Sequence, residues 1–190
     1  RAKKQIKANL ISFIGGVLSP KIRKTQNKYI QLGCGSELKE NFDNLDFYPM
    51  RFKEIGNFKH IYHDLRRPLP YENEKFEGAF SEHTLEHLYY DEALNLLKEI
   101  KRILKPGAIF RCTVPDLEKY IDFYNGNLSD NFFNKFSFKA QALYNLTQNY
   151  EHKSVWDYEL LSKKITEVGF KDVCKKKYKD GENSNLLLDL

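Results

Sequence analysis

The feature that most constrains the fold of this chain is a repeated pattern in which a short apolar segment is followed by glycine or a polar residue. The segments span residues 28–32, 42–47, 60–65 and 76–81, and the features at their ends are Gly33-Cys34-Gly35, Asp46, Asp64 and Ser81. Short strands that alternate with helices predict an α/β domain with a largely parallel central sheet flanked by helices. Ligands bind at the carboxyl ends of such strands, so we expect these features to share one edge.

Hydrophobic periodicity predicts the remaining elements. In residues 91–104, Leu94, Leu97, Ile100 and Leu104 recur at helical spacing. Further along the chain we expect a strand at 108–114, helices at about 117–125 and 130–147, a helix from 154 to a cap at Gly169, and a strand at 171–178. Only residues 33–41 separate the first two strands, which is too short for a crossover helix. The first crossover helix should therefore be reduced to a turn.

The basic charge of the chain is concentrated at its N-terminal end. Of the 31 Lys and Arg residues, eight lie in residues 1–30, which contain no Asp or Glu. Within residues 1–24, apolar side chains recur at helical spacing, which predicts an amphipathic helix, and the apolar run is too short to span a bilayer. Such a helix either packs on its own domain or makes peripheral contact with a membrane surface.

Length and cysteine content set further bounds. A chain of 190 residues suits one domain, here residues 28–190, preceded by the basic helix and linker at 1–27. The three cysteines include no C-x-x-C pair, so the sequence predicts neither a disulfide framework nor a cysteine-rich zinc site. We therefore expect a cytoplasmic protein, with association at the membrane surface as an open alternative.

The features at the strand ends favour a ligand that contains adenosine. A glycine pair allows close approach to the backbone, and an aspartate at a strand end can accept both hydroxyls of a ribose. Each aspartate taken alone is equally well explained as a helix cap. The triphosphate motif G-x-x-x-x-G-K-[ST] is absent, and Ser36-Glu37 follows GCG where a dinucleotide site would need a third glycine. S-adenosylmethionine (SAM) fits these constraints.

Four segments occur in an order that resembles a known family: YIQLGCG, NLDFYP, HDLRRPLPYENEKFEGAFSEHTLEHL and LKEIKRILKPGAIFRCTVPDL. They resemble class I SAM-dependent methyltransferases, most closely the type 11 methyltransferase-like group, over about residues 28–178. The resemblance implies a Rossmann-like fold for residues 28–190, a methyltransferase activity and SAM as the cofactor. The domain at 28–190 is then a methyltransferase domain.

The resemblance also implies roles for particular residues. Gly33, Cys34 and Gly35 would pass under the cofactor, Asp46 would hold its ribose, Asp64 and Leu65 would border the adenine, and Ser81, Glu82 and His83 would line the methionine end. Gln31 stands where many relatives have an acidic residue that helps to bind the ammonium group of the cofactor. The uncharged amide of Gln31 replaces that acidic side chain in this sequence.

The segment SEHTLEHL, residues 81–88, also contains the H-x-x-E-H spacing of a class of zinc peptidases. A catalytic zinc usually needs a third protein ligand, and this segment lies at a predicted junction between a strand and a helix. In the methyltransferase interpretation, His83 points into the cofactor cleft, while Glu86 and His87 lie at the helix start or at the substrate rim. We therefore prefer a site without metal to a zinc peptidase.

The catalytic candidates are His83, His152 and Asp157, because an acceptor hydroxyl or carboxyl group can require a base. Core packing is the alternative for His152, and a helix cap is the alternative for Asp157. The sequence contains no N/D-P-P-Y motif, so methylation of DNA bases has no support. RNA remains an open alternative as the acceptor. We prefer a small molecule, a sugar or a lipid-linked saccharide. Two other functions remain: a catalytically inactive cofactor-binding partner subunit, and a protein that interacts with membrane surfaces.

Overall fold

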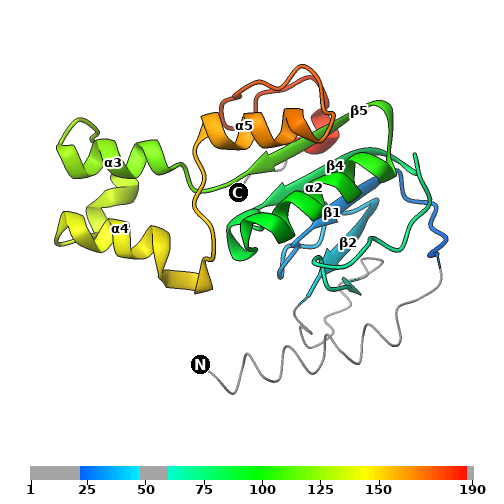
Figure 1. Ribbon diagram of the computed structural model, residues 1–190, viewed down its shortest axis with the longest axis horizontal. Helices are drawn as coiled ribbons and strands as arrows, with labels where there is room; N and C mark the ends of the chain where they lie inside the picture. The colour runs from blue at the N-terminus through cyan, green and yellow to red at the C-terminus, as the bar shows by residue number, and fades with distance from the viewer. Residues whose placement is uncertain (1–21, 48–59, 188–190) are drawn as a thin grey trace. The chain divides into compact units, whose positions relative to one another are not determined.

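The computed structural model of the chain describes residues 22–47 and 60–187 (Figure 1). The predicted helix within residues 1–24 lies almost entirely outside them and stays a prediction. No helix in the described ranges combines the length and the apolarity needed to cross a bilayer. The chain divides into two compact units. The first contains the described residues up to Ser81 together with Lys98–Arg111, and the second contains Glu82–Leu97 and the described residues from Cys112 onward.

A five-stranded sheet of order β3-β2-β1-β4-β5 organises the first unit. Its strands are β1 (Tyr29–Leu32), β2 (Phe42–Asp46), β3 (His60–Tyr62), β4 (Phe76–Glu82) and β5 (Leu104–Thr113). Strand β1 pairs in parallel with both β2 and β4, and β2 pairs in parallel with β3, as Figure 1 shows for the central strands. The prediction of a largely parallel sheet is therefore confirmed.

The central strands β1 and β2 are buried on both faces, and one of these faces is largely apolar. The side chains of Ile30, Leu32 and Leu45 are fully buried, as expected for central parallel strands. No helix occurs among residues 33–41, so the reduced first crossover is also confirmed. The chain instead runs from β1 to β2 through a turn and irregular structure.

Helix α2 (Tyr90–Ile103) matches the predicted amphipathic helix, with acidic residues in its first turn and basic residues in its last. Ala93, Leu96, Leu97 and Ile100 form a buried stripe along it. Strand β5 begins at Leu104, directly after the helix, and includes the Lys-Pro-Gly segment. The prediction that this strand starts at residue 108 was wrong, because Gly107 stays in the strand at a φ of 77°.

Arg102, in the last turn of α2, holds the proline-rich loop that precedes β4. Its guanidinium donates to the carbonyl oxygens of Leu69 and Tyr71 at 2.9 and 2.7 Å, and to Glu99 one turn earlier at 2.7 and 2.8 Å. Glu99 in turn accepts from the backbone amide of Leu69 at 2.7 Å. The Glu99–Arg102 pair thus satisfies backbone groups of a loop that has no regular hydrogen-bond ladder.

The second unit contains the helices that follow β5. They are α3 (Leu117–Asn125), the 3-10 turn η2 (Asn131–Lys135), α4 (Lys139–Thr147), the 3-10 turn η3 (Asn149–Glu151), α5 (Tyr158–Glu167) and the 3-10 turn η4 (Ser184–Leu186). Helices α3 and α4 lie side by side (Figure 1). Tyr120, Phe133, Ala142 and Leu146 form their shared core.

Two predictions for this unit were wrong in detail. The helix expected at 130–147 is broken, because Phe136 and Phe138 are extended and the Phe138 amide donates to the Gln141 side chain to start α4. The strand expected at 171–178 does not form in the described chain. Asp172 has a left-handed φ of 55°, and most of the segment is exposed, so it buries no apolar face.

We expect Arg102→Ala to lower the free energy of unfolding by about 1.5–3 kcal/mol, because charged hydrogen bonds to two loop carbonyls are lost. Urea denaturation followed by circular dichroism would measure the change. Lys98→Ala removes an exposed positive charge from the same helix and should change the free energy by less than about 0.5 kcal/mol. Equal effects of the two substitutions would show that Arg102 does not hold the loop.

Candidate functional site

The glycine turn after β1 is tied to the end of β2. Gly33 and Gly35 have φ values of 72° and 50°, in the region that favours glycine. The amides of Gly33 and Cys34 both donate to the carbonyl of Leu45, at 2.8 and 3.1 Å. The amide of Gly35 donates to Oδ2 of Asp46 at 2.8 Å. The structure thus brings together the glycine turn and the predicted ribose-binding aspartate.

No atom of the described residues occupies the space beside Gly35. A Cβ built on Gly35 would meet no atom of the described chain within 4 Å, so glycine is required there by its backbone conformation rather than by crowding. Open space next to a glycine backbone lets a ligand approach closely. The turn therefore fits the predicted role of Gly33 and Gly35.

Buried polar groups surround the ends of β1 and β4. Oε1 of Gln31 and Oγ of Ser81 are buried without a hydrogen-bond partner among the described residues. Unpaired buried polar atoms of this kind are uncommon and call for a partner. Cys34 is also buried, and burial together with the charge of Asp46 raises the pKa of its thiol to about 12. The Cys34 side chain is therefore an uncharged thiol at neutral pH.

Asp64 and Leu65, the predicted neighbours of the adenine, are both buried. The Asp64 carboxylate is held by Arg66, whose Nε and Nη2 donate to its two oxygens at 2.9 and 2.8 Å. The Arg66 guanidinium also lies over the ring of Phe47, 5.2 Å from its centroid. Asp64 is thus the anchor of an arginine, and an adenine contact through its carboxylate stays a prediction.

In the second unit, the segment from Glu82 to Leu88 turns sharply after β4. Strand β4 ends at Glu82, His83 has a left-handed φ of 48°, and the 3-10 turn η1 (Leu85–His87) follows. The expectation that this segment is a junction and not part of a long helix is confirmed. The amide of His83 donates to the carbonyl of Thr113 at 3.2 Å, which fixes the turn against the end of β5.

A hydrogen bond connects His83 and Glu86 within this turn. Nδ1 of His83 lies 3.0 Å from Oε1 of Glu86, and this hydrogen bond, with the charges of Glu86 and Glu82, raises the pKa of His83. The His83 side chain is 61% exposed, whereas that of Glu86 is 2% exposed. Glu86 lies in the first turn of η1 with a buried carboxylate, so the expected position at the helix start is confirmed, and a contact with a substrate stays a prediction.

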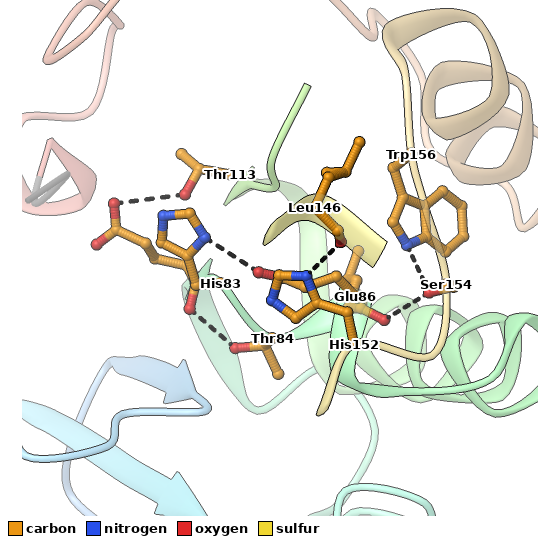
Figure 2. Close-up of polar contacts among 10 residues, drawn as sticks. His83, Thr84, Glu86, Thr113, Leu146, His152, Ser154 and Trp156 are labelled. Atoms are coloured by element: carbon orange, nitrogen blue, oxygen red, sulfur yellow. Dashed lines mark hydrogen bonds and ion pairs between the residues drawn. The ribbon is translucent and has the colours of Figure 1, made fainter. Parts of the chain in front are cut away.

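The segment 152–156 packs directly on η1. The amides of Lys153 and Ser154 both donate to the carbonyl of Glu86, at 2.7 and 3.1 Å, and Oγ of Ser154 donates to the carbonyl of Leu85 at 3.1 Å. The indole of Trp156 donates to Oγ of Ser154 at 2.9 Å (Figure 2). The sequence did not predict these contacts, because no local residue pattern relates residues 85–86 to residues 153–156.

This packing places His152 against His87. Their ring centroids are 4.9 Å apart at an interplanar angle of 79°. Nδ1 of His152 lies 2.7 Å from the carbonyl oxygen of Leu146, as Figure 2 shows. Burial, opposed in part by the charge of Glu86, lowers the pKa of His87, so its imidazole is neutral at pH 7.

Asp157 has a structural role in the chain. Its Oδ1 accepts a hydrogen bond from the amide of Leu160 at 2.7 Å, which makes it the N-cap of α5. The helix cap that the sequence offered as the alternative for Asp157 is therefore confirmed. Catalysis by Asp157 stays a prediction.

The chain is similar to known methyltransferases in sequence and in fold. Residues 40–112 match the model of a methyltransferase domain. The fold is similar to that of a SAM-dependent methyltransferase from Thermotoga maritima, at 15% identity and a TM-score of 0.55, over 90% of this chain and 77% of that one. It is also similar to a chain of the complex between the Haloferax volcanii Trm112 methyltransferase activator and a methyltransferase, at 14% identity and a TM-score of 0.50, over 96% and 82% of the two chains. No curated protein matches. The predicted Rossmann-like class I methyltransferase fold is confirmed.

We expect Asp157→Ala to lower the free energy of unfolding by about 1 kcal/mol, the usual effect of losing an N-cap. Asp157→Asn should retain most of the stability, because asparagine caps helices almost as well. Thermal and urea unfolding of the two variants would measure the difference. If both variants are as stable as the parent chain, the cap does not contribute, and catalysis becomes the better explanation for this residue.

Proposed function

We propose that this chain, whose residues 40–112 match a methyltransferase domain, is a SAM-dependent methyltransferase that acts on a small-molecule, sugar or lipid-linked saccharide acceptor. One observation carries the proposal furthest: the turn Gly33–Gly35 and Asp46 are joined by a hydrogen bond at the carboxyl ends of adjacent parallel strands. That edge is where open α/β sheets bind their ligands. The class I methyltransferase fold supports the same assignment.

The residues of the first unit fit SAM. Gly35 offers backbone whose side is unoccupied by other described residues, and Asp46 offers a carboxylate for the ribose hydroxyls. The unpartnered Oε1 of Gln31 and Oγ of Ser81 are suited to polar groups of a ligand. Asp64 and Leu65 would border the adenine.

When bound, SAM supplies a methyl group already activated by the positive charge of the sulfonium. The protein therefore has to align the acceptor with the methyl carbon and, for an acceptor hydroxyl, to remove a proton. We assign proton removal to His83. Its Nδ1 is fixed by Glu86 and its side chain is largely exposed, so Nε2 is the nitrogen available to an acceptor.

The acceptor class is inferred from the family resemblance. An inactive cofactor-binding subunit is the alternative, and a methyl-transfer assay separates the two. Transfer of label from SAM to saccharide, lipid-linked saccharide and small hydroxyl or amine compounds supports the proposal. Transfer to RNA alone would replace the acceptor class, and SAM binding without transfer to any acceptor would favour the inactive subunit.

We expect SAM and S-adenosylhomocysteine each to raise the melting temperature of the purified protein, because a ligand that binds only the folded state stabilises it. A thermal shift series with increasing ligand would measure the effect, with ATP and NAD as control nucleotides. Mass spectrometry of the gently purified protein should detect a co-purified ligand. No shift with either SAM or S-adenosylhomocysteine would contradict the proposal.

Asp46→Asn should weaken SAM binding about tenfold or more, which corresponds to about 1.4 kcal/mol or more. The asparagine oxygen can still accept from the Gly35 amide, so the turn is preserved while the charge that strengthens the ribose hydrogen bonds is removed. Calorimetry would give the dissociation constants. Glu40→Gln removes an exposed carboxylate from the same connection and should leave them unchanged. An Asp46→Asn variant with parental affinity would exclude Asp46 from the site.

A further inference from the structure

Three side chains that can bind metal converge in the second unit. Glu86 and His87 come from η1, and His152 comes from the segment after α4. Each offers one ligand atom, and the three atoms all lie within 4.8 Å of one another. Figure 2 shows the imidazole of His152 beside the carboxylate of Glu86. This spacing is suitable for a single ion between the three groups.

Glu86 provides an independent sign that a ligand is needed. The residue is 1% exposed, and Oε1 of its carboxylate is engaged by Nδ1 of His83 at 3.0 Å. Its Oε2 is buried and has no hydrogen-bond partner in the described part of the chain. A buried carboxylate oxygen without a donor is costly, so a cation is the partner that this position favours.

His152 is oriented as a ligand. The carbonyl oxygen of Leu146 can only accept a hydrogen bond, so Nδ1 of His152, 2.7 Å away, carries the proton. In that tautomer the lone pair lies on Nε2. A histidine whose one nitrogen donates to a carbonyl while the other carries a free lone pair is the usual arrangement around protein-bound metals.

We propose that Glu86, His87 and His152 bind a divalent transition-metal ion. Two imidazoles with one carboxylate suit Zn²⁺, Mn²⁺, Fe²⁺ or Co²⁺, whereas Mg²⁺ and Ca²⁺ prefer sites made of oxygen ligands. Three protein ligands leave coordination positions for water or for an oxygen atom of another molecule. His83 is the outer partner of this site, because it holds the second oxygen of Glu86.

This site differs from the one suggested by the H-x-x-E-H spacing. There, His83 and His87 would be the histidine ligands, and no third ligand was evident. In the structure, His83 is outside the three-residue cluster, and His152 completes it. The proposal therefore replaces our expectation from the sequence of a protein without metal.

The test is metal binding by the full chain after dialysis against a chelator, measured without SAM so that it is independent of the methyltransferase proposal. Calorimetric titration with Zn²⁺ and with Mn²⁺ should give one ion per chain for at least one of them. Glu86→Gln should weaken binding about tenfold or more, because it removes the charge and Oε2 but keeps an oxygen for His83. His152→Asn should act similarly, since the asparagine amide can still donate to the Leu146 carbonyl while Nε2 is lost.

His60→Asn is the matched control, because it removes a histidine of β3 in the other compact unit. The His60→Asn variant should bind the metal ion with the affinity of the parent protein. In the absence of metal, Glu86→Gln should melt at the parental temperature or above, since a neutral amide replaces a buried carboxylate. The rise in melting temperature that metal gives the parent should be lost. Parental affinity in both Glu86→Gln and His152→Asn, or no binding of either ion by the parent, would overturn the proposal.

A second measurement remains decisive if the variants do not fold. Co²⁺ added to the parent protein should give a visible absorption that differs from that of aqueous Co²⁺ and disappears when Zn²⁺ is added. This absorption reports the coordination geometry of the bound ion and requires no substitution. A parent protein that leaves the Co²⁺ spectrum unchanged would overturn the proposal.

Discussion

One backbone carbonyl, that of Glu86, joins two segments of the second unit that are distant in the sequence. The carbonyl of Glu86 accepts hydrogen bonds from the amides of Lys153 and Ser154, which joins the short turn after β4 to a segment that follows α2, α3 and α4 in the chain. The hydroxyl of Ser154 repeats the connection one residue earlier, at Leu85, and Trp156 buries it. Once these bonds form, the position of His152 is determined, and with it the contact with His87.

A corresponding constraint operates in the first unit, through a side chain rather than a carbonyl. Asp46 ends β2 and accepts from the amide of Gly35, so the glycine turn cannot shift without losing a charge-assisted bond. The same carboxylate contributes to the raised pKa of Cys34. Asp46 therefore shapes the turn, keeps a neighbouring thiol uncharged and is the expected contact for a ribose.

The sequence predicted well those features that depend on neighbouring residues. The apolar strands, the amphipathic stripe of α2, the turn in place of the first crossover helix and the cap at Asp157 all follow from local pattern, and the structure has them. The predictions failed where contacts between distant residues decide. The break before α4 depends on where Phe133 is buried, and residues 171–178 find no strand partner. The contact between His152 and His87 likewise could not be predicted from the local sequence pattern.

The left-handed backbone conformation of His83 limits which amino-acid substitutions this position can accept during evolution. At a φ of 48°, glycine, asparagine and aspartate fit the turn with little strain, whereas valine, isoleucine and threonine do not. The first three lack an imidazole, and each gives Glu86 a different neighbour. A lineage that loses the histidine therefore keeps the fold of the turn with least strain when one of these three residues replaces it. The backbone, and not only the chemistry, decides which descendants of this site are accessible.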